Sequence, residues 1–206
     1  SYALLSEPQK TLFTALAVFQ GGWTLSDAQQ VCEFMDASAL ETLCRMSLVQ
    51  PHASGSHFST LEYLREYAHE QQGVPEREAG QQRHAEHFLR LAEEATVHLE
   101  RKKHRRYLRR LTEEHENLRT AVTFWLSAHL QKALRLAGAL SRYWEVQGNW
   151  TEWSQTLEAA WNAVDTHADV WAVRVGRERG LVAFRRGEVA LAHDHSLTAL
   201  ALSRTL

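Results

Sequence analysis

The chain has 206 residues, of which 44% are hydrophobic and 23% are charged, and its formal net charge is −2. This composition is typical of a folded globular protein and excludes an intrinsically disordered chain. The sequence contains no apolar run close to the roughly 18 residues that a transmembrane helix needs, so we expect no membrane partner. Its two cysteines, Cys32 and Cys44, lack metal-type spacing; we interpret them as buried free thiols in preference to a disulfide, which indicates the cytoplasm.

The three prolines all lie in the first 75 residues, at Pro8, Pro51 and Pro75. The proline-free remainder favours uninterrupted helices. We therefore predict two domains, residues 1–74 and 75–206, with a boundary and candidate hinge at Gly73-Val74-Pro75. The chain opens on a helix start and stops inside a predicted helix, so we expect a segment of a larger protein whose second domain is truncated at its C-terminus.

The first domain is predicted to be a winged helix. Ser6 and Gln9 have the spacing of a capping box for a first helix, which Gly21-Gly22 ends. Thr24 is expected to cap a second helix, and Asp36 or Ser38 a third. A short hairpin follows, with strands at 47–50 and 57–59 around a turn at 51–55, and then a fourth helix from Leu61 to Ala68.

The second domain is predicted to be a row of helices. Their expected ranges are 76–98, 103–129, 131–147, 150–165, 169–186 and 189–205. The last two have small residues where paired helices of a tetratricopeptide (TPR) repeat approach closely, namely Gly180, Gly187, Ala192 and Ala199. The predicted fold is therefore mainly all-α: a winged helix with a small β-hairpin, followed by an antiparallel TPR-like helical array.

Charge weighs against the DNA-binding role that many winged helices have. Residues 1–75 contain three positive and eight negative side chains, and the third helix offers only Arg45 beside Asp36 and Glu41. An autonomous DNA-binding regulator is kept as the alternative function, but we expect no direct nucleic-acid binding. The run 101–110, seven of whose residues are Lys or Arg, either binds phosphate or is a solvated helix start paired with Glu113 and Glu114.

Motifs for catalysis and metal binding are missing from the sequence. It has no GxxxxGK[ST] loop, His-Glu-x-x-His, paired CxxC or GxSxG. We therefore expect no enzyme activity, and no catalytic, cofactor-binding or metal-binding residues in this segment. The pairs His84/His87 and His193/His195 are interpreted as surface or capping residues.

Five of the seven tryptophans lie close together, at Trp144, Trp150, Trp153, Trp161 and Trp171. They either fill gaps between irregular repeats or line a groove for a ligand or a peptide. The candidate groove consists of Arg142, Trp144, Trp150 and Trp153, and we expect Trp150 and Trp153 to be its exposed members. Its occupant would be an unknown protein or small-molecule signal.

Several strings, taken in order, resemble one family. Residues 16–25, LAVFQGGWTL, are similar to the "LavFxGGwtL" opening that follows the nucleotide-binding domain of bacterial signal-transduction ATPases. Residues 61–68 resemble "LETvREYA", residues 83–88 resemble "RHAeyF", and residues 116–121 resemble "dNLRaAl". The resemblance extends over essentially the whole chain and points to STAND-class ATPases, including LuxR- and AfsR-type regulators and the maltose-regulon activator class.

This resemblance implies a role and partners. In that family an effector domain and a P-loop ATPase domain precede a winged helix and a helical-repeat sensor. The chain would be the non-catalytic sensor segment of a transcription regulator, relaying its state to an absent nucleotide-binding domain that holds ATP or ADP. Relatives carry a Met-His-Asp motif where this sequence has Thr60-Leu61-Glu62, so Glu62 is the candidate contact with that domain.

Overall fold

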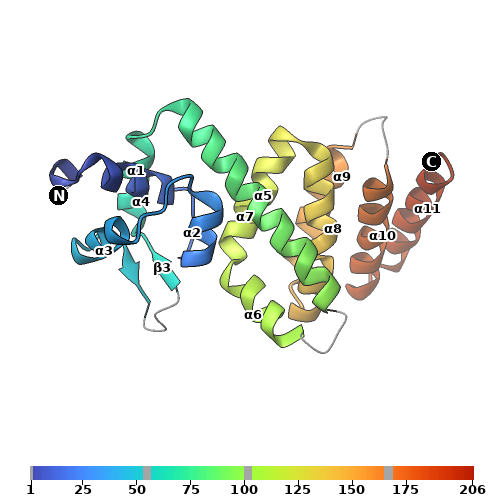
Figure 1. The fold of residues 1–206 in the computed structure, drawn as a ribbon. Helices are drawn as coiled ribbons and strands as arrows, with labels where there is room; N and C mark the ends of the chain where they lie inside the picture. Colours follow the sequence, from blue (N-terminus) through green and yellow to red (C-terminus); the bar gives the residue numbers. More distant parts are fainter. Residues whose placement is uncertain (1, 53–56, 100–103, 165–168) are drawn as a thin grey trace. The chain divides into compact units, whose positions relative to one another are not determined.

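The computed structural model describes residues 2–52, 57–99, 104–164 and 169–206. Helices dominate and three short strands form one small sheet, so the predicted mainly all-α fold with a small β-hairpin is confirmed (Figure 1). The chain divides into two compact units: unit 1 is Ser1–Phe88 with Glu113–Ala121, and unit 2 is Leu89–Thr112 with Val122–Leu206. None of the helices in these described residues is apolar and long enough to span a bilayer.

Unit 1 begins with a helical and strand pattern that matches the winged-helix expectation. After the 3₁₀ helix η1 (Tyr2–Leu4), its elements are α1 (Glu7–Leu16), β1 (Trp23–Thr24), α2 (Leu25–Val31), α3 (Ala37–Arg45), β2 (Gln50–Pro51), β3 (His57–Ser59) and α4 (Glu62–Glu70). The expected caps are present. Gln9 Oε1 accepts from the Ser6 N–H (2.9 Å), and the Asp36 carboxylate accepts from the Ser38 N–H (3.0 Å).

The small sheet is antiparallel, with strand order β1-β3-β2. The sequence prediction missed β1, because a two-residue strand next to a helix cap has no periodicity to reveal it. Pairing Trp23 with Phe58 stacks their rings, with centroids 4.9 Å apart. The first hairpin strand is shorter than expected and begins only at Gln50. Residues 53–56 of the expected turn lie outside the described residues.

The remaining helices are α5 (Val74–Leu99), α6 (His104–Glu113), α7 (His115–Ala128), α8 (Leu130–Gln147), α9 (Trp150–Asn162), α10 (Val170–Arg185) and α11 (Val189–Ser203). The prediction of one helix over 103–129 was wrong, because the chain breaks at Glu114 into α6 and α7. The break falls where the chain passes from unit 2 to unit 1: Leu111 is buried in unit 2, whereas Glu114 and Asn117 are buried in unit 1. The expected boundary between residues 74 and 75 stays a prediction.

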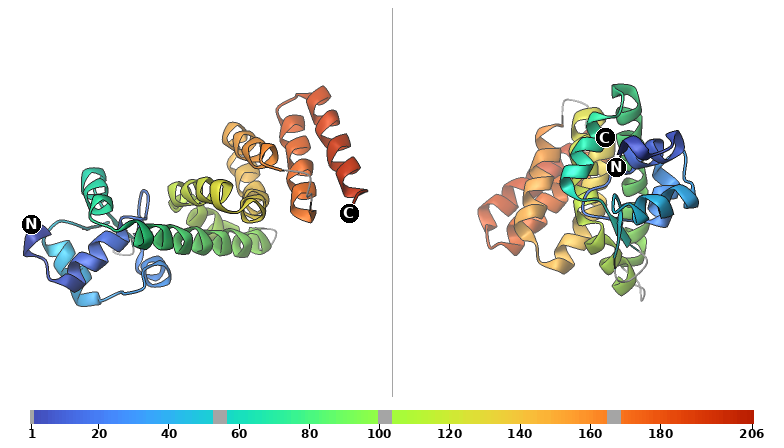
Figure 2. Two further views of the ribbon diagram at one scale, coloured as in Figure 1. Left: turned by 90° about the horizontal axis from the view of Figure 1, so that it is seen from above. Right: turned by 90° about the vertical axis from the view of Figure 1, so that its left-hand side faces the viewer.

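In unit 2, α8 to α11 follow one another side by side (Figure 2). Large side chains fill the spaces between them, among them Leu136, Leu140, Trp153 and Leu157. The close approach expected at Gly180 is present, since a Cβ there would lie 2.7 Å from Ser196 Oγ and 3.3 Å from the Ala192 carbonyl oxygen. The TPR assignment itself stays a prediction.

Two helical glycines allow the steric role of this contact to be tested. A Cβ at Gly176 in α10 would lie 2.8 Å from Trp161 Cζ3 and 3.0 Å from Ala199 Cβ, whereas Gly80 in α5 has no atom within 4 Å. We expect Gly80→Ala to raise the free energy of unfolding by about 1 kcal/mol through helix propensity. Gly176→Ala should instead lower it by about 1–3 kcal/mol through overpacking. Urea unfolding followed by circular dichroism measures both; equal stabilisation would contradict the close packing of α10 on α11.

Candidate functional site

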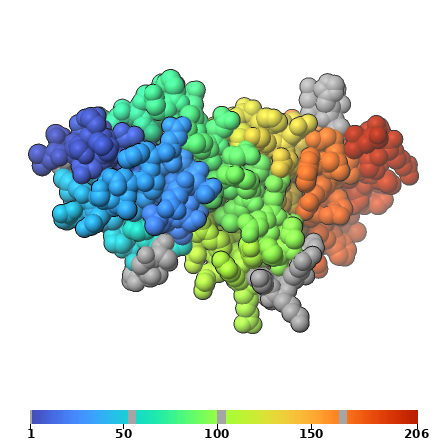
Figure 3. All heavy atoms as spheres, in the orientation of Figure 1, coloured from blue at the N-terminus to red at the C-terminus, as the bar shows by residue number. Residues whose placement is uncertain are grey.

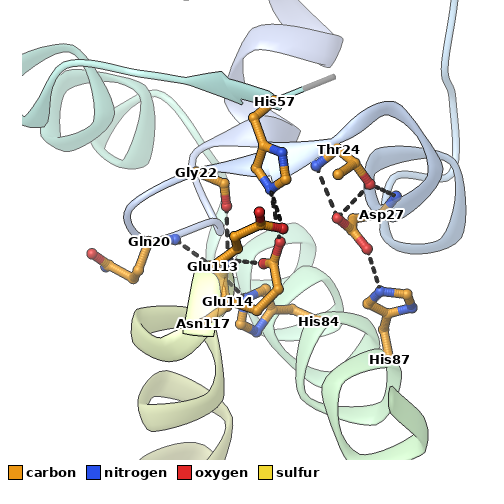
Figure 4. A network of polar contacts seen from close by, with 10 residues as sticks. All are labelled: Gln20, Gly22, Thr24, Asp27, His57, His84, His87, Glu113, Glu114 and Asn117. Atoms are coloured by element: carbon orange, nitrogen blue, oxygen red, sulfur yellow. Dashed lines mark hydrogen bonds and ion pairs between the residues drawn. The ribbon is translucent and has the colours of Figure 1, made fainter. Parts of the chain in front are cut away.

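A buried polar network in unit 1 joins the turn after α1 to helices α5 and α7. Figure 4 shows its ten residues, drawn from the turn at Gln20–Gly22, from α2, β3 and α5, and from the chain around the start of α7. The turn can form because Gly21 adopts a left-handed φ of +76°, which other residues rarely tolerate. At Gly22 a Cβ would lie 3.1 Å from the Phe58 carbonyl oxygen, so β3 also favours glycine there.

Asn117 of α7 is the centre of the network and is fully buried. Its Oδ1 accepts from the Gln20 backbone N–H (2.7 Å), and its Nδ2 donates to the Gly22 carbonyl oxygen (2.7 Å) and to Glu114 Oε2 (2.7 Å). The backbone groups fix the orientation of this amide, because an N–H can only donate and a C=O can only accept. Oδ1 lies 3.1 Å from His84 Nε2, which must then be the protonated ring nitrogen.

His84 is a core residue, so its interpretation as a surface or capping histidine was wrong. Its ring is 1% exposed and lies against Phe19 and Phe88, with centroids 5.5 and 4.6 Å away. Burial lowers the pKa of His84 to about 4 because the charged imidazolium would lose its hydration, and the hydrogen bond to Asn117 only partly opposes this effect. The ring is therefore neutral at physiological pH and acts as a fixed donor.

A second branch of the network connects α5 to α2. His87 was also expected to be a surface or capping residue, yet it is half-buried, its Nε2 donates to Asp27 Oδ1 over 2.8 Å, and Asp27 is 2% exposed. Asp27 Oδ2 accepts from both the backbone N–H and the hydroxyl of Thr24, over 2.8 and 2.6 Å, while the Asp27 N–H donates to Thr24 Oγ1. The predicted cap at Thr24 is thus confirmed, and the Asp27 carboxylate that completes it also holds α5.

A third branch reaches the strand β3. His57 Nε2 lies 3.4 Å from Glu114 Oε1 and 3.9 Å from Glu113 Oε2, and Glu114 has no exposed surface. The network therefore links the sheet, the Gly-Gly turn and α2 to α5 and α7. Its hydrogen-bonding groups are matched to one another, which suits a structural clamp and does not resemble a nucleophile with its base. Within the described residues no group of three or more His, Cys, Asp or Glu is arranged to hold a metal ion.

The sequence did not predict that these residues form one network. Thr24 was expected only as a helix cap, Gly22 as the end of a helix, and Glu113 and Glu114 as partners of the preceding arginines; the roles of Asp27 and Asn117 were not predicted. The available signal was helical spacing, because Glu114 and Asn117 occur three residues apart on the stripe that continues with Leu118 and Ala121, all of them buried. Polar residues on an otherwise apolar stripe indicate a buried hydrogen-bonded cluster.

Glu62, the candidate contact with a nucleotide-binding domain, lies exposed on α4. Its carboxylate pairs with the Arg65 guanidinium one turn later, and this hydrogen bond lowers the pKa of Glu62.

Helix α4 also presents aromatic side chains: Tyr63 and Tyr67, four residues apart, are 64% and 40% exposed. Leu4 of η1 is 80% exposed, and the Tyr2 ring packs edge-on against Tyr67 at 5.4 Å. A cavity of about 300 Å³ opens here, lined by Tyr2, Ala3, Phe13, Leu48, Leu64 and Tyr67.

The predicted tryptophan groove in unit 2 is only partly accessible. The expected exposure of Trp153 was wrong: it is 0% exposed and its Nε1–H donates to Ser141 Oγ over 3.2 Å. Trp144 is buried too, at 3% exposed. Trp150 is half-buried, with its ring 5.8 Å from Trp153. Arg142 is exposed, and its guanidinium lies 2.5 Å from the Glu145 carboxylate. Partial burial alone would raise the pKa of Glu145, but the pKa is lowered, chiefly by the hydrogen bond from Arg142.

The other predicted histidine pair behaves differently in its two members. His193 is an exposed residue of α11, as expected for a surface histidine. His195 is half-buried, and its Nε2 lies 3.4 Å from Glu158 Oε1. The same carboxylate accepts both Nε–H and Nη2–H bonds from Arg179, at 2.8 and 2.7 Å. This cluster ties α9 to α10 and α11.

Some curated proteins are similar to part of this chain. No family model matches the sequence, and no solved structure matches it. The chain is similar to proteins named "Putative HTH-type transcriptional regulator" from Mycobacterium tuberculosis (strain ATCC 25618 / H37Rv) and Mycobacterium bovis. Each is 29% identical over 153 residues, which make up 70% of this chain and 17% of the relative. The chain therefore spans a small part of the length of the curated relatives it matches.

Replacing the central amide should destabilise unit 1. In Asn117→Ala, the Gln20 N–H, the Gly22 carbonyl, His84 and Glu114 each lose a buried partner, and we expect the free energy of unfolding to fall by about 3 kcal/mol or more. The matched control is Asn162→Ala at the exposed end of α9, which should change it by less than about 0.5 kcal/mol. Urea unfolding measures both, and equal costs would show that the network contributes nothing to stability.

The low pKa of His84 predicts a pH dependence of stability. An unfolded histidine titrates near 6.5, so between about pH 6.5 and 4 the unfolded chain binds a proton that folded His84 refuses. This group therefore lowers the free energy of unfolding by about 2 kcal/mol as pH falls from 7 to 5. His84→Gln should remove that part of the slope, whereas His193→Gln should keep it. Urea titrations at several pH values measure the slope; an unchanged slope in His84→Gln would contradict the buried neutral ring.

Proposed function

We propose that this chain is a non-catalytic regulatory segment of a transcription regulator, in which the part before α5 contacts another domain of the same protein and unit 2 receives the signal. Two likenesses support the regulatory role. The curated relatives are named as transcriptional regulators and are much longer than this chain. The ordered sequence strings resemble the segment that follows the nucleotide-binding domain of STAND-class ATPases. On this proposal that domain binds ATP or ADP, and the protein works in the cytoplasm.

The aromatic face of α4 is the observation that carries the proposal. Large apolar side chains exposed together mark a surface that binds protein. Here Tyr63 and Tyr67 are exposed on α4, Tyr67 also lines the small cavity, and the ion-paired Glu62 and Arg65 lie on the same helix. Aromatic residues are enriched at the centres of protein interfaces. The proposed occupant is the nucleotide-binding domain.

The buried network suits the relay that such a contact needs. Asn117, His84 and His87 fasten the small sheet and the Gly-Gly turn to α5 and α7, and each of these helices continues from unit 1 into unit 2. A signal that binds unit 2 would shift the population between a state with the α4 contact and a state without it. The signal would be a protein or a small molecule, with Arg142 and Trp150 as accessible candidates for its binding.

The side chains of α3 argue against the alternative function, an autonomous DNA-binding regulator. The buried face of this helix consists of Ala39, Leu40 and Leu43, which pack inside unit 1. Its exposed positions include Glu41 and Arg45, so one acidic and one basic residue face solvent. Phosphate binding needs several cations, and a glutamate opposes it.

Site-specific photo-crosslinking tests this proposal. A photoreactive phenylalanine analogue replaces Tyr63 on α4, or Ser38 on α3 as the matched exposed control, in the gene at its native locus. From position 63 we expect protein crosslinks to another domain of the same polypeptide, and from position 38 neither these nor DNA crosslinks. Mass spectrometry identifies the joined peptides or nucleotides.

Two outcomes would decide against the proposal. DNA crosslinks from position 38 would favour the autonomous DNA-binding regulator. Crosslinks from position 63 that do not change with the nucleotide bound to the protein would favour a scaffold without a switching role. Transcript profiles of the strain carrying Tyr63→Asp should change relative to Gln30→Asp, at an exposed position of α2, since an added carboxylate disrupts an apolar contact but is tolerated on an exposed polar surface.

A further inference from the structure

Helix α6 carries four arginines, Arg105, Arg106, Arg109 and Arg110, and this cluster has no part in the proposed function. Successive residues of an α-helix are about 100° apart, so the four side chains fall within an arc of about 140°. The opposite side of the helix packs inward: Leu111 is buried, and Tyr107 and Leu108 are half-buried. The arginine face is therefore the outward face of the helix.

Three contacts within unit 2 hold α6 in this orientation. The Tyr107 ring stacks on His98 of α5, with centroids 4.4 Å apart and planes 9° from parallel, and its hydroxyl donates to Glu94 over 2.7 Å. Thr112 Oγ1 accepts from Gln147 Nε2 at the end of α8 over 2.5 Å. Arg105, Arg106 and Arg109 are exposed, and the atoms of α6 (yellow-green) reach the surface in Figure 3.

We infer that this arginine face binds the phosphate backbone of nucleic acid without reading its sequence. The four positive charges lie within about 7.5 Å along the helix axis. A duplex presents one phosphate per roughly 1.7 Å of its own axis, so several of these guanidinium groups can contact phosphates at the same time. The planar guanidinium of arginine matches phosphate oxygens in pairs. Within the described part of the chain Arg105 and Arg106 make no salt bridge, whereas Arg109 and the half-buried Arg110 each interact with another group of the chain.

The inference is independent of the domain contact proposed for α4. It concerns another unit and another chemistry, and it departs from the sequence expectation of no nucleic-acid binding. It assigns no base contacts, because arginines spaced along one short helix face reach phosphates in any sequence. The contact would add affinity to whichever part of the protein recognises a particular DNA site.

Fluorescence anisotropy of labelled duplexes with two unrelated sequences tests the inference on the 206-residue chain. The wild-type protein should bind both duplexes equally, with an affinity that falls steeply as salt is raised. Arg105→Gln/Arg106→Gln/Arg109→Gln should flatten the slope of log K against log salt by about 2.7, since each lost phosphate contact removes about 0.9. The charge-matched control Arg90→Gln/Arg186→Gln/Arg204→Gln changes three other exposed arginines and should keep the wild-type slope.

Two further arms distinguish phosphate binding from binding to an acidic protein and from a general effect of net charge. The triple lysine variant of Arg105, Arg106 and Arg109 keeps the charge and should keep most of the salt slope; loss of that slope would contradict a phosphate contact.

Poly-glutamate should compete poorly with the duplex at equal charge concentration, and equal competition would overturn the inference in favour of an acidic protein surface. An equal loss of slope in the glutamine variant and its charge-matched control would show a net-charge effect and would also overturn it. Circular dichroism confirms that each variant is folded.

Discussion

The carboxamide of Asn117 imposes the main constraint on unit 1, because it is buried where no water can replace a lost partner. A buried amide without hydrogen bonds is costly, and this one engages both of its donor hydrogens and both sides of its oxygen. Its partners come from the Gly-Gly turn, α5 and the residue before α7. The turn lies 95 to 97 residues before Asn117 and His84 lies 33 residues before it, so one side chain fixes a long-range arrangement that apolar packing alone would leave less specific.

The same constraint explains the unusual chemistry nearby. His84 must donate to Asn117, and its apolar surroundings keep it neutral. Asp27 and Glu114 are also buried, and each is matched to a histidine from another element, His87 or His57. Buried groups of this kind are stable only as a complete set, since removing one partner leaves another unsatisfied. The cluster therefore fastens the sheet, α2, α5 and α7 to one another.

The two surfaces considered for binding differ in chemistry and therefore in partner. The α4 face offers exposed tyrosines and a small cavity. Ordered water is released when another apolar surface covers these side chains. The α6 face offers arginines, whose attraction is long-ranged and weakens with salt. On the two proposals above, the α4 face contacts another domain of the protein and the α6 face contacts phosphate groups.

Sequence patterns by themselves determined the helical class, the positions of most helices, the caps at Ser6, Thr24 and Asp36, and the small residues between α10 and α11. These features depend on residues close together in the chain, or on the helical period. Tertiary structure alone decided that the helix over 103–129 breaks at Glu114, that Trp153 and His84 are buried, and that Asp27 meets His87 from sixty residues away. Burial and hydrogen bonding between distant elements depend on how the chain closes on itself, and local periodicity contains no record of those partners.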